Sequence, residues 1–281
     1  MIGRMARGVT RGPVYVVMAA IGLFWLVPTI GLLVASLRTT SDNGTTGWWT
    51  ALTKPSELTL ENYRQLFSSG SKIPHSLINT MLIALPSTLL VLGVAALAAY
   101  AFAWIRFPGR DALFLVVIGL LVVPLQVALI PIAKLYGEIG LFGRIPGVVL
   151  FHVAFGLPFA IFLLRNFFAG IPHELLEAAR MEGAGELRVF SRVVLPLGYP
   201  ALAALAIFQF LWVWNDLLVA VVFASPESAP VTVAIREQTR QFASNVNVIA
   251  PGAFVSMVVP LIVFFAFQRY FVQGLLAGSQ K

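Results

Sequence analysis

Long apolar runs constrain this chain more than any other feature. A helix that spans a bilayer needs about 20 mostly apolar residues, and six stretches of the 281-residue sequence meet that requirement. Only 11% of the residues are charged, well below the roughly 25% of a soluble domain. We therefore expect an all-α membrane protein with six transmembrane helices. The predicted spans are Val14–Leu37, Leu77–Ile105, Ala112–Ala133, Ile145–Leu164, Leu197–Ala224 and Ala250–Phe267.

Every one of the six runs contains proline. Proline breaks helices in water but is tolerated within membranes, where neighbouring helices satisfy the freed carbonyl groups. The sequence therefore predicts kinked helices that pack against one another. The first run is too long for a signal peptide and lacks a convincing cleavage site, so we expect it to be retained. The prolines away from the ends of the runs are Pro28, Pro86, Pro124, Pro131, Pro158, Pro200 and Pro260.

Basic residues predict the orientation. Arg4, Arg7 and Arg11 precede the first run with no acid among them, and positive charges favour the cytoplasmic side. With that end inside, 11 of the 19 basic residues fall in cytoplasmic segments and 8 in external ones. We expect the chain to lie in the plasma membrane with both termini in the cytoplasm. The expected organisation is a cytoplasmic N-terminus (1–13), a first helix (14–37), an external loop (38–76), a core (77–271) and a cytoplasmic tail (272–281).

The external loop carries signs of local structure. Trp48 and Trp49 suit a membrane interface. Thr59 is placed to cap a short helix that runs through Phe67, with Glu61 in its first turn. We expect a small external cap.

The loop at 165–196 is the one substantial inner segment. Pro172 suits the first position of a helix, Glu174 complements the helix dipole, and Gly183 is a natural left-handed stop. A second helix is predicted over Glu186–Leu195, ahead of the next span. Its apolar face would comprise Leu187, Phe190 and Val194.

The helix predicted between Pro172 and Gly183 has features of a protein-docking element. Small side chains allow a partner to approach the backbone, and Glu177 and Arg180 could set the register through charge pairing. We expect the Glu177-Ala178-Ala179 turn to face outward. The residues alone leave a plain interfacial helix equally open.

The segment EAARMEGAGELRVFSRVVLP resembles the cytoplasmic signature of binding-protein-dependent ABC importer permeases. That signature reads E-A-A, three residues, G, nine residues, I, one residue, L-P, and only Val193 departs from it. In that family the segment is the coupling helix that docks into the ATPase subunit. The resemblance implies a type I ABC importer permease fold and assigns coupling to Glu177, Ala178, Ala179, Arg180, Gly183, Leu195 and Pro196.

The resemblance extends from about Leu77 to Lys281 and is closest to carbohydrate permeases, specifically the smaller six-span subunit of the maltose-type pair. It rests on Ser76–Thr80, Phe107–Arg110 and Trp214–Asp216. The C-terminal tail resembles one that enters the interface between two ATPases, although Leu276 replaces a common threonine and the usual terminal glycine is missing. The tail residues so implied are Gly274, Leu275, Gly278 and Gln280.

The implied function is ATP-driven import of a sugar or oligosaccharide, with an α-glucoside or maltodextrin as the favoured guess and a polyamine or other polar solute as the alternative. The implied partners are a second permease in a heterodimer, an ATPase dimer and an external solute-binding protein. No lysine follows the glycine of a phosphate-binding loop. The chain is therefore predicted to be no enzyme and to hold no cofactor, with ATP and magnesium on the ATPase.

Polar residues inside the spans are few. Asp216 and His152 are the only acid and histidine there, and intramembrane ionisable groups mark functional sites by default. We favour a packing or gate role for Asp216 over substrate contact, and a satisfied buried state for His152. Asn215, Asp216 and Asn79 are the candidate pathway or gate residues, and Asn79 is expected to make an interhelical hydrogen bond.

Two other classes compete with this hypothesis. An ion-coupled secondary transporter would use Asp216 as its proton site. A membrane hydrolase is suggested by His173-Glu174-Leu175-Leu176-Glu177, but the pattern ends in glutamate where a zinc site needs a second histidine. No metal or catalytic residue is predicted, since the remaining histidines, His75 and His152, stand far apart in the sequence. A nucleic-acid partner is not predicted either, because the charges sit in short gaps between apolar runs rather than on a basic face.

Overall fold

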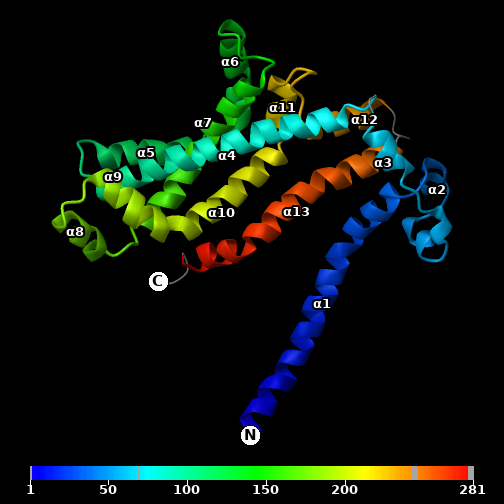
Figure 1. Ribbon diagram of the computed structural model, residues 1–281, viewed down its shortest axis with the longest axis horizontal. Coiled ribbons are helices and arrows are strands. Elements are labelled where there is room, and N and C mark those ends of the chain that lie inside the picture. The colour runs from blue at the N-terminus through cyan, green and yellow to red at the C-terminus, as the bar shows by residue number, and fades with distance from the viewer. Residues whose placement is uncertain (1, 69, 242–245, 278–281) are drawn as a thin grey trace. The chain divides into compact units, whose positions relative to one another are not determined.

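The computed structural model describes residues 2–68, 70–241 and 246–277 and is helical throughout, with no strand in those residues (Figure 1). Side chains are described over 13–68, 70–239 and 248–268. The chain divides into two compact units. The first comprises Met1–Pro74 with Ile235–Met257, and the second comprises His75–Ala234 with Val258–Lys281.

The helices begin and end as follows. The first unit holds α1 (Ile2–Ser36), α2 (Thr40–Thr45), the 3-10 turns η1 (Trp48–Leu52) and η2 (Pro55–Glu57), and α3 (Glu61–Leu66). The second holds α5 (Arg110–Leu120), α6 (Leu125–Glu138), α7 (Ile145–Phe168), α8 (His173–Met181), α9 (Glu186–Val189), the π-helical turn η3 (Phe190–Val194), α10 (Leu195–Trp214) and α11 (Leu218–Phe223). Residues of both units belong to α4 (Ile73–Trp104), α12 (Val231–Gln241) and α13 (Val246–Ala277).

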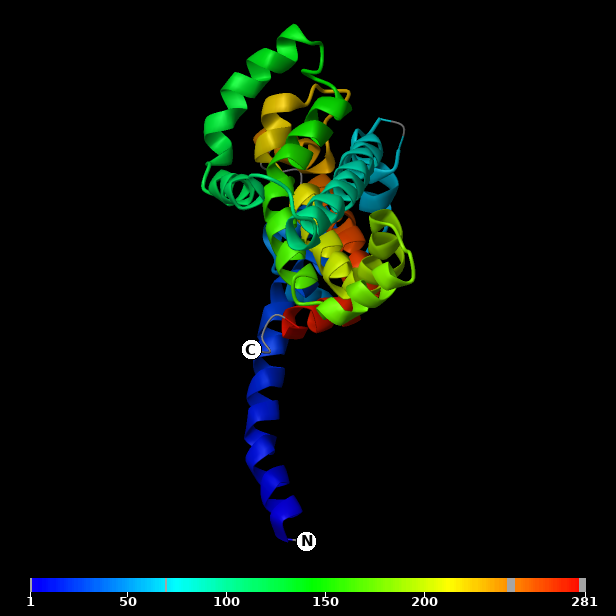
Figure 2. The same cartoon turned by 90° about the vertical axis from the view of Figure 1, so that its left-hand side faces the viewer.

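Five helical stretches of the described chain are long and apolar enough to cross a membrane, and a bent pair makes a sixth. The five correspond to the first, second, fourth, fifth and sixth predicted spans. The predicted third span, Ala112–Ala133, is wrong as a single helix. It is divided between α5 and α6, which meet at 97°, a bend that is plain in Figure 2.

Proline causes the break between α5 and α6. Pro124 has no N–H to donate and disfavours helical backbone at the preceding residue. The chain closes instead through tight turns, in which the amides of Val122 and Val123 donate to the carbonyls of Gly119 and Leu120 at 3.1 and 3.2 Å. Pro124 then stands as the N-cap of α6. The prolines inside α4, α7 and α10 leave those helices continuous.

The predicted fifth span is also shorter than expected. Helix α10 ends at Trp214, whereas the prediction ran to Ala224. Asn215 Nδ2 turns back to donate to the Leu211 carbonyl at 2.8 Å. The Asp216 carboxylate accepts from the amides of Val219 and Ala220 at 3.3 and 3.0 Å. These short polar side chains compete with the helix for backbone groups and start α11 as a separate helix.

Helix α7 forms the centre of the second unit. It packs against α5, α10 and α11, and Phe151, Leu164 and Phe168 on it are buried. Close approach to α10 depends on glycine, because a side chain on Gly198 would place its Cβ 2.5 Å from the Phe168 ring. Small residues at contacts of this kind are what membrane helices use to pack.

A buried arginine organises the loop of the first unit. Arg38 is fully buried and pairs with Glu57 at 2.8 Å. Its guanidinium also donates to the Asp42 carbonyl at 3.2 Å and to the Thr50 hydroxyl at 3.1 Å. Asn62 adds hydrogen bonds of 2.9 and 2.7 Å to two carbonyl groups at the end of α1 and just after it. One cation thus ties α2, η1 and η2 together. The sequence prediction missed this centre.

The short helix of the loop is close to its prediction. Helix α3 covers Glu61–Leu66, inside the expected Thr59–Phe67, and its N-cap is Leu60. The Thr59 hydroxyl still accepts from the Glu61 amide at 3.1 Å. Trp49 is 62% exposed.

Glu57→Ala should open the loop locally, because Arg38 would stay buried without its counterion. Breaking such a pair costs about 3 kcal/mol, which corresponds to amide exchange over residues 38–66 that is about 100-fold faster. Glu61→Ala is the matched control, since Glu61 is 54% exposed and 3.5 Å from Arg64. Hydrogen exchange read by mass spectrometry checks both variants, and equal protection in the two would contradict the central role of Arg38.

Candidate functional site

Helix α8 realises most of the prediction made for the inner loop. It runs from His173 to Met181 with Glu174 in its first turn, and Pro172 is its N-cap, one position before the expected one. Leu176 is fully buried, and Ala179 packs against the same core. Glu177 and Ala178 are exposed. The expectation that all three residues of the Glu-Ala-Ala turn face outward is therefore wrong for Ala179.

Gly183 ends α8 in the predicted left-handed conformation, with φ of +82°. The Gly183 amide donates to the Arg180 carbonyl and the Ala184 amide to the Ala179 carbonyl, both at 3.0 Å. This pair of hydrogen bonds is the Schellman motif, which satisfies the last carbonyl groups of a helix. The chain then reverses into α9. We call the segment His173–Val189 the α8–α9 hairpin.

The predicted second helix, Glu186–Leu195, does not stand alone. The chain continues through α9, η3 and α10 as one 29-residue helical stretch that ends at Trp214. Val189, Phe190 and Val194 are buried while Leu187 is 74% exposed. The predicted inward position of Leu187 is therefore wrong.

Glu186 braces the hairpin. The Arg180 guanidinium donates to both of its carboxylate oxygens, at 2.9 and 3.1 Å, and the Tyr100 hydroxyl of α4 donates to Oε2. The hydrogen bond to Glu186 raises the pKa of Arg180 above its ordinary value. Bidentate arginine pairs fix geometry as well as charge. Arg180 therefore helps to fix the fold of the hairpin, and its coupling role stays a prediction.

The exposed face of α8 carries polar side chains together with two large apolar groups, Leu175 and Met181. Glu177 lies 3.1 Å from His173 Nδ1, and Met181 is 84% exposed. The C-terminal end of α4 supports the hairpin, since Trp104 Nε1 donates to the Phe168 carbonyl at 3.1 Å. Further along, Leu195 is partly buried and Pro196 is exposed. Figure 1 shows α8 and α9 beyond the end of α4.

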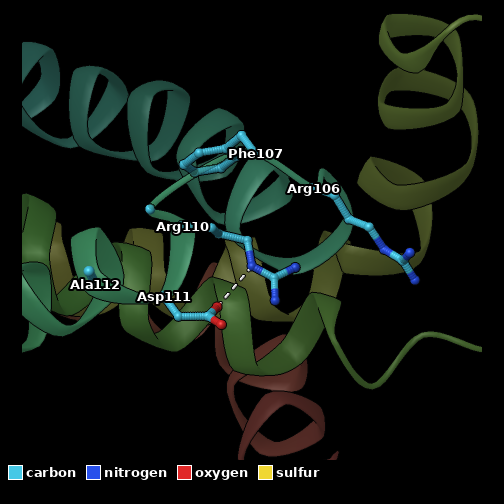
Figure 3. A pocket seen from close by; sticks show the side chains of 6 residues that line it. Arg106, Phe107, Arg110, Asp111 and Ala112 are labelled. Atoms are coloured by element: carbon cyan, nitrogen blue, oxygen red, sulfur yellow. Dashed lines mark hydrogen bonds and ion pairs between the residues drawn. The ribbon is translucent and has the colours of Figure 1, made fainter.

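The turn between α4 and α5 forms a shallow basic pocket at the same end of the second unit. Its volume is about 340 Å³, and Arg106, Phe107, Gly109, Arg110 and Asp111 line it. Arg110 Nε pairs with Asp111 at 2.9 Å, as Figure 3 shows, while Arg106 extends away from that pair. Arginines beside helix ends suit contact with anionic headgroups.

Asp216 and His152 lie together, a contact that the sequence predictions for the two residues did not include. His152 Nε2 is 3.6 Å from Asp216 Oδ2, an ion-pair distance when the ring is protonated. His152 Nδ1 is 2.9 Å from the Val148 carbonyl oxygen. Since two amides of α11 also donate to Asp216, the carboxylate is well supplied with partners. This geometry agrees with the packing role favoured for it.

Asn79 holds a loop in place. Its Nδ2 donates to the carbonyls of Glu227 and Ala229 at 2.8 and 3.1 Å. The expected hydrogen bond of Asn79 is thus present, but to the loop before α12 rather than between two spans. Thr232 of α12 donates to the Asp216 carbonyl at 2.7 Å. Asn215 is exposed and hydrogen-bonded within its own chain segment. A gate role for these residues stays a prediction.

No group of histidine, cysteine and acidic residues in the described chain has the arrangement of a metal site. His173 and Glu177 form an exposed pair on one face of α8. Of the predicted tail residues, Gly274 and Leu275 fall within α13, with side chains outside those described, and Gly278 and Gln280 lie outside the described residues.

Comparison with known proteins assigns the chain to a protein family. A family model described as "Binding-protein-dependent transport system inner membrane component" matches residues 90–276. The chain belongs to that family and is a multi-pass membrane permease of an ABC importer.

Particular relatives agree with this assignment. The osmoprotective compounds uptake permease protein GgtD of a Synechocystis species is 46% identical over 96% of this chain and 92% of its own length. The alpha-glucoside transport system permease protein AglG of Rhizobium meliloti is 47% identical over 89% of this chain and 67% of its own. The crystal structure of a bacterial ABC transporter involved in the import of alginate shares the fold, with a TM-score of 0.76, 22% identity and coverage of 96% of this chain and 98% of that one.

Gly183→Ser should weaken the hairpin, because a residue with a Cβ costs about 1 kcal/mol at positive φ. Gly185→Ser is the matched control, since Gly185 is the N-cap of α9 with φ of −71° and serine is favoured at that position. Amide exchange over residues 173–190 should be about fivefold faster in the first variant only. Equal exchange in both variants would show that the Schellman turn is not what orders the hairpin.

Proposed function

We propose that this chain imports a sugar or short oligosaccharide as one of two permeases in a complex whose ATP hydrolysis takes place on a separate ATPase dimer. The observation that carries the proposal is the Glu-Ala-Ala segment on an exposed hairpin that is braced against the rest of its unit. A projecting element with buried supports is what a separate protein needs in order to move a bundle of helices. ATP and magnesium belong to the ATPase in this proposal.

The hairpin is suited to act as a lever. Glu186 joins α8 to α4, and the same helical stretch continues from Glu186 to Trp214. At 1.5 Å per residue this stretch is about 43 Å long, the thickness of a whole bilayer with its headgroups. A push on Glu177 would therefore tilt α10 over its entire length. In this proposal, ATP binding draws two such hairpins together and opens the path outward.

The relatives support the substrate class. The name of AglG assigns that protein an α-glucoside, and this chain is 47% identical to it. A second candidate is a polar osmolyte, because GgtD is named for osmoprotective compounds at 46% identity. Sugar-stimulated ATPase activity of the assembled complex separates the two. A polyamine remains a third candidate only by analogy.

The remaining parts of the complex are proposed from the family description. A binding-protein-dependent system needs an external solute-binding protein. Six spans form half of a path, so we infer a second permease, and a heterodimer is favoured over a homodimer. An ion-coupled carrier is disfavoured because Asp216 already accepts two backbone hydrogen bonds and faces His152.

Glu177→Lys should uncouple transport from ATP, because the substitution reverses the charge that α8 presents to the ATPase. The fold should be unaffected, since the Glu177 side chain is 58% exposed. We expect sugar uptake to fall at least tenfold while the amount of this chain in the membrane stays unchanged. Glu237→Lys is the control, an exposed charge reversal on α12, and should transport normally. Full uptake by the Glu177→Lys complex would contradict the docking role.

Orientation can be tested directly because the chain contains no cysteine. With both termini cytoplasmic, Ser56→Cys in the external loop should react with an impermeant maleimide in intact cells. Glu182→Cys in the hairpin should react only after the membrane is opened; both positions are exposed in the structure. Labelling of Glu182→Cys in intact cells would place the hairpin outside and end the proposal.

A further inference from the structure

A cavity between α7 and α10 plays no part in the coupling hairpin. Its volume is about 290 Å³, at the lower end of ligand cavities, which run from roughly 300 to 1,000 Å³. Both helices contribute to its wall, and aromatic rings make up most of it. The lining residues are Phe155, Gly156, Phe159, Phe208, Gln209 and Trp212.

One polar side chain enters this apolar wall. Gln209 is only 4% exposed, and its Nε2 has no hydrogen-bond partner in the part of the chain that the structure describes. An amide buried without a partner costs free energy of roughly 1–3 kcal/mol. Lipid tails cannot offset that cost, because they have no acceptor. The amide therefore indicates a polar ligand rather than an acyl chain.

Glycine makes room for this amide. A side chain on Gly156 would place its Cβ 2.8 Å from both the oxygen and the nitrogen of the Gln209 amide. Gly156 is also the twelfth of the 24 residues of α7, so the cavity lies halfway along that helix. Transporters commonly hold their substrates at this depth.

The aromatic wall is itself held in position. The Trp212 ring lies 5.5 Å from the His152 ring in an edge-to-face arrangement, and His152 is fixed by the Val148 carbonyl and faces Asp216. Trp212, Phe159 and Phe208 remain 39%, 44% and 41% exposed. Half-exposed rings beside a buried amide offer apolar faces together with one directed donor, a combination that matches a pyranose ring with its C–H faces and hydroxyl groups.

We propose that this cavity is a sugar subsite, in which the Gln209 amide donates to a hydroxyl oxygen while one pyranose ring lies against Trp212 and the neighbouring phenylalanines. The inference rests on the proposed function and extends it, because it assigns substrate contact to this chain itself. His152 and Asp216 then act as positioning residues for Trp212.

The test uses the whole complex in nanodiscs and a diazirine derivative of an α-glucoside disaccharide whose unmodified form the wild-type complex takes up. Photolabelling should mark peptides that contain residues 155–159 and 208–212. Gln209→Leu should lower that labelling about three- to tenfold, the effect of one lost hydrogen bond. The melting temperature should not fall, since the variant removes an unpaired amide.

Two further variants sharpen the result. Gly156→Ala should lower the labelling in the same way by displacing the Gln209 amide. Leu197→Ala is the control and should label normally, because Leu197 is a 45% exposed residue on α10, the helix that carries Gln209. Unchanged labelling in Gln209→Leu, or a loss of the partner permease from the complex in that variant, would overturn the subsite. Failure of the wild-type complex to take up any sugar would overturn the proposed function and the subsite with it.

Discussion

The contact of Glu186 with Arg180 and Tyr100 is the interaction on which the rest of the functional arrangement depends. It joins α8, the start of α9 and the end of α4 at one carboxylate. Without it the hairpin would be held mainly by Leu176 and Val189, which are buried beneath it. Apolar burial favours compactness but sets no direction, whereas a bidentate pair fixes the angle between two helices. A lever needs that angle.

The second constraint is that membrane-embedded backbone groups must find partners within the protein. Each break in the predicted spans obeys it. At Pro124 the chain uses tight turns, and after Trp214 the Asp216 carboxylate accepts from the first amides of α11 while Asn215 Nδ2 adds a second hydrogen bond to the Leu211 carbonyl. Asn215 and Asp216, two of the three polar residues that suggested a transport path from sequence, are thus engaged where one helix ends and the next begins. Among the described side chains, the Gln209 amide nitrogen is one of five buried polar atoms without a hydrogen-bond partner, and it is the one that lines a cavity between two helices, which is why it suggests a ligand.

The sequence was informative where local rules decide. Apolar runs located the spans, and Gly183 gave the end of α8 because few other residues adopt its φ of +82°. It failed where the outcome depends on distant partners. Nothing near Arg38 in the chain marks it as the centre of a folded loop, and Tyr100 and Glu186 are separated by 86 residues. Leu187 was misplaced, since it is exposed although Phe190 and Val194 of the same predicted face are buried. Gln209 was not singled out from the sequence, and only the fold sets it in a cavity.

The claim that a separate ATPase grips the α8–α9 hairpin is tested most directly by amide exchange over residues 173–189, measured in the membrane complex with and without the ATPase subunits. The account predicts slower exchange when the ATPase is bound, concentrated on the outward turn around Glu177 and Ala178. Identical exchange in the two states, together with solute uptake by the complex without its ATPase, would contradict it.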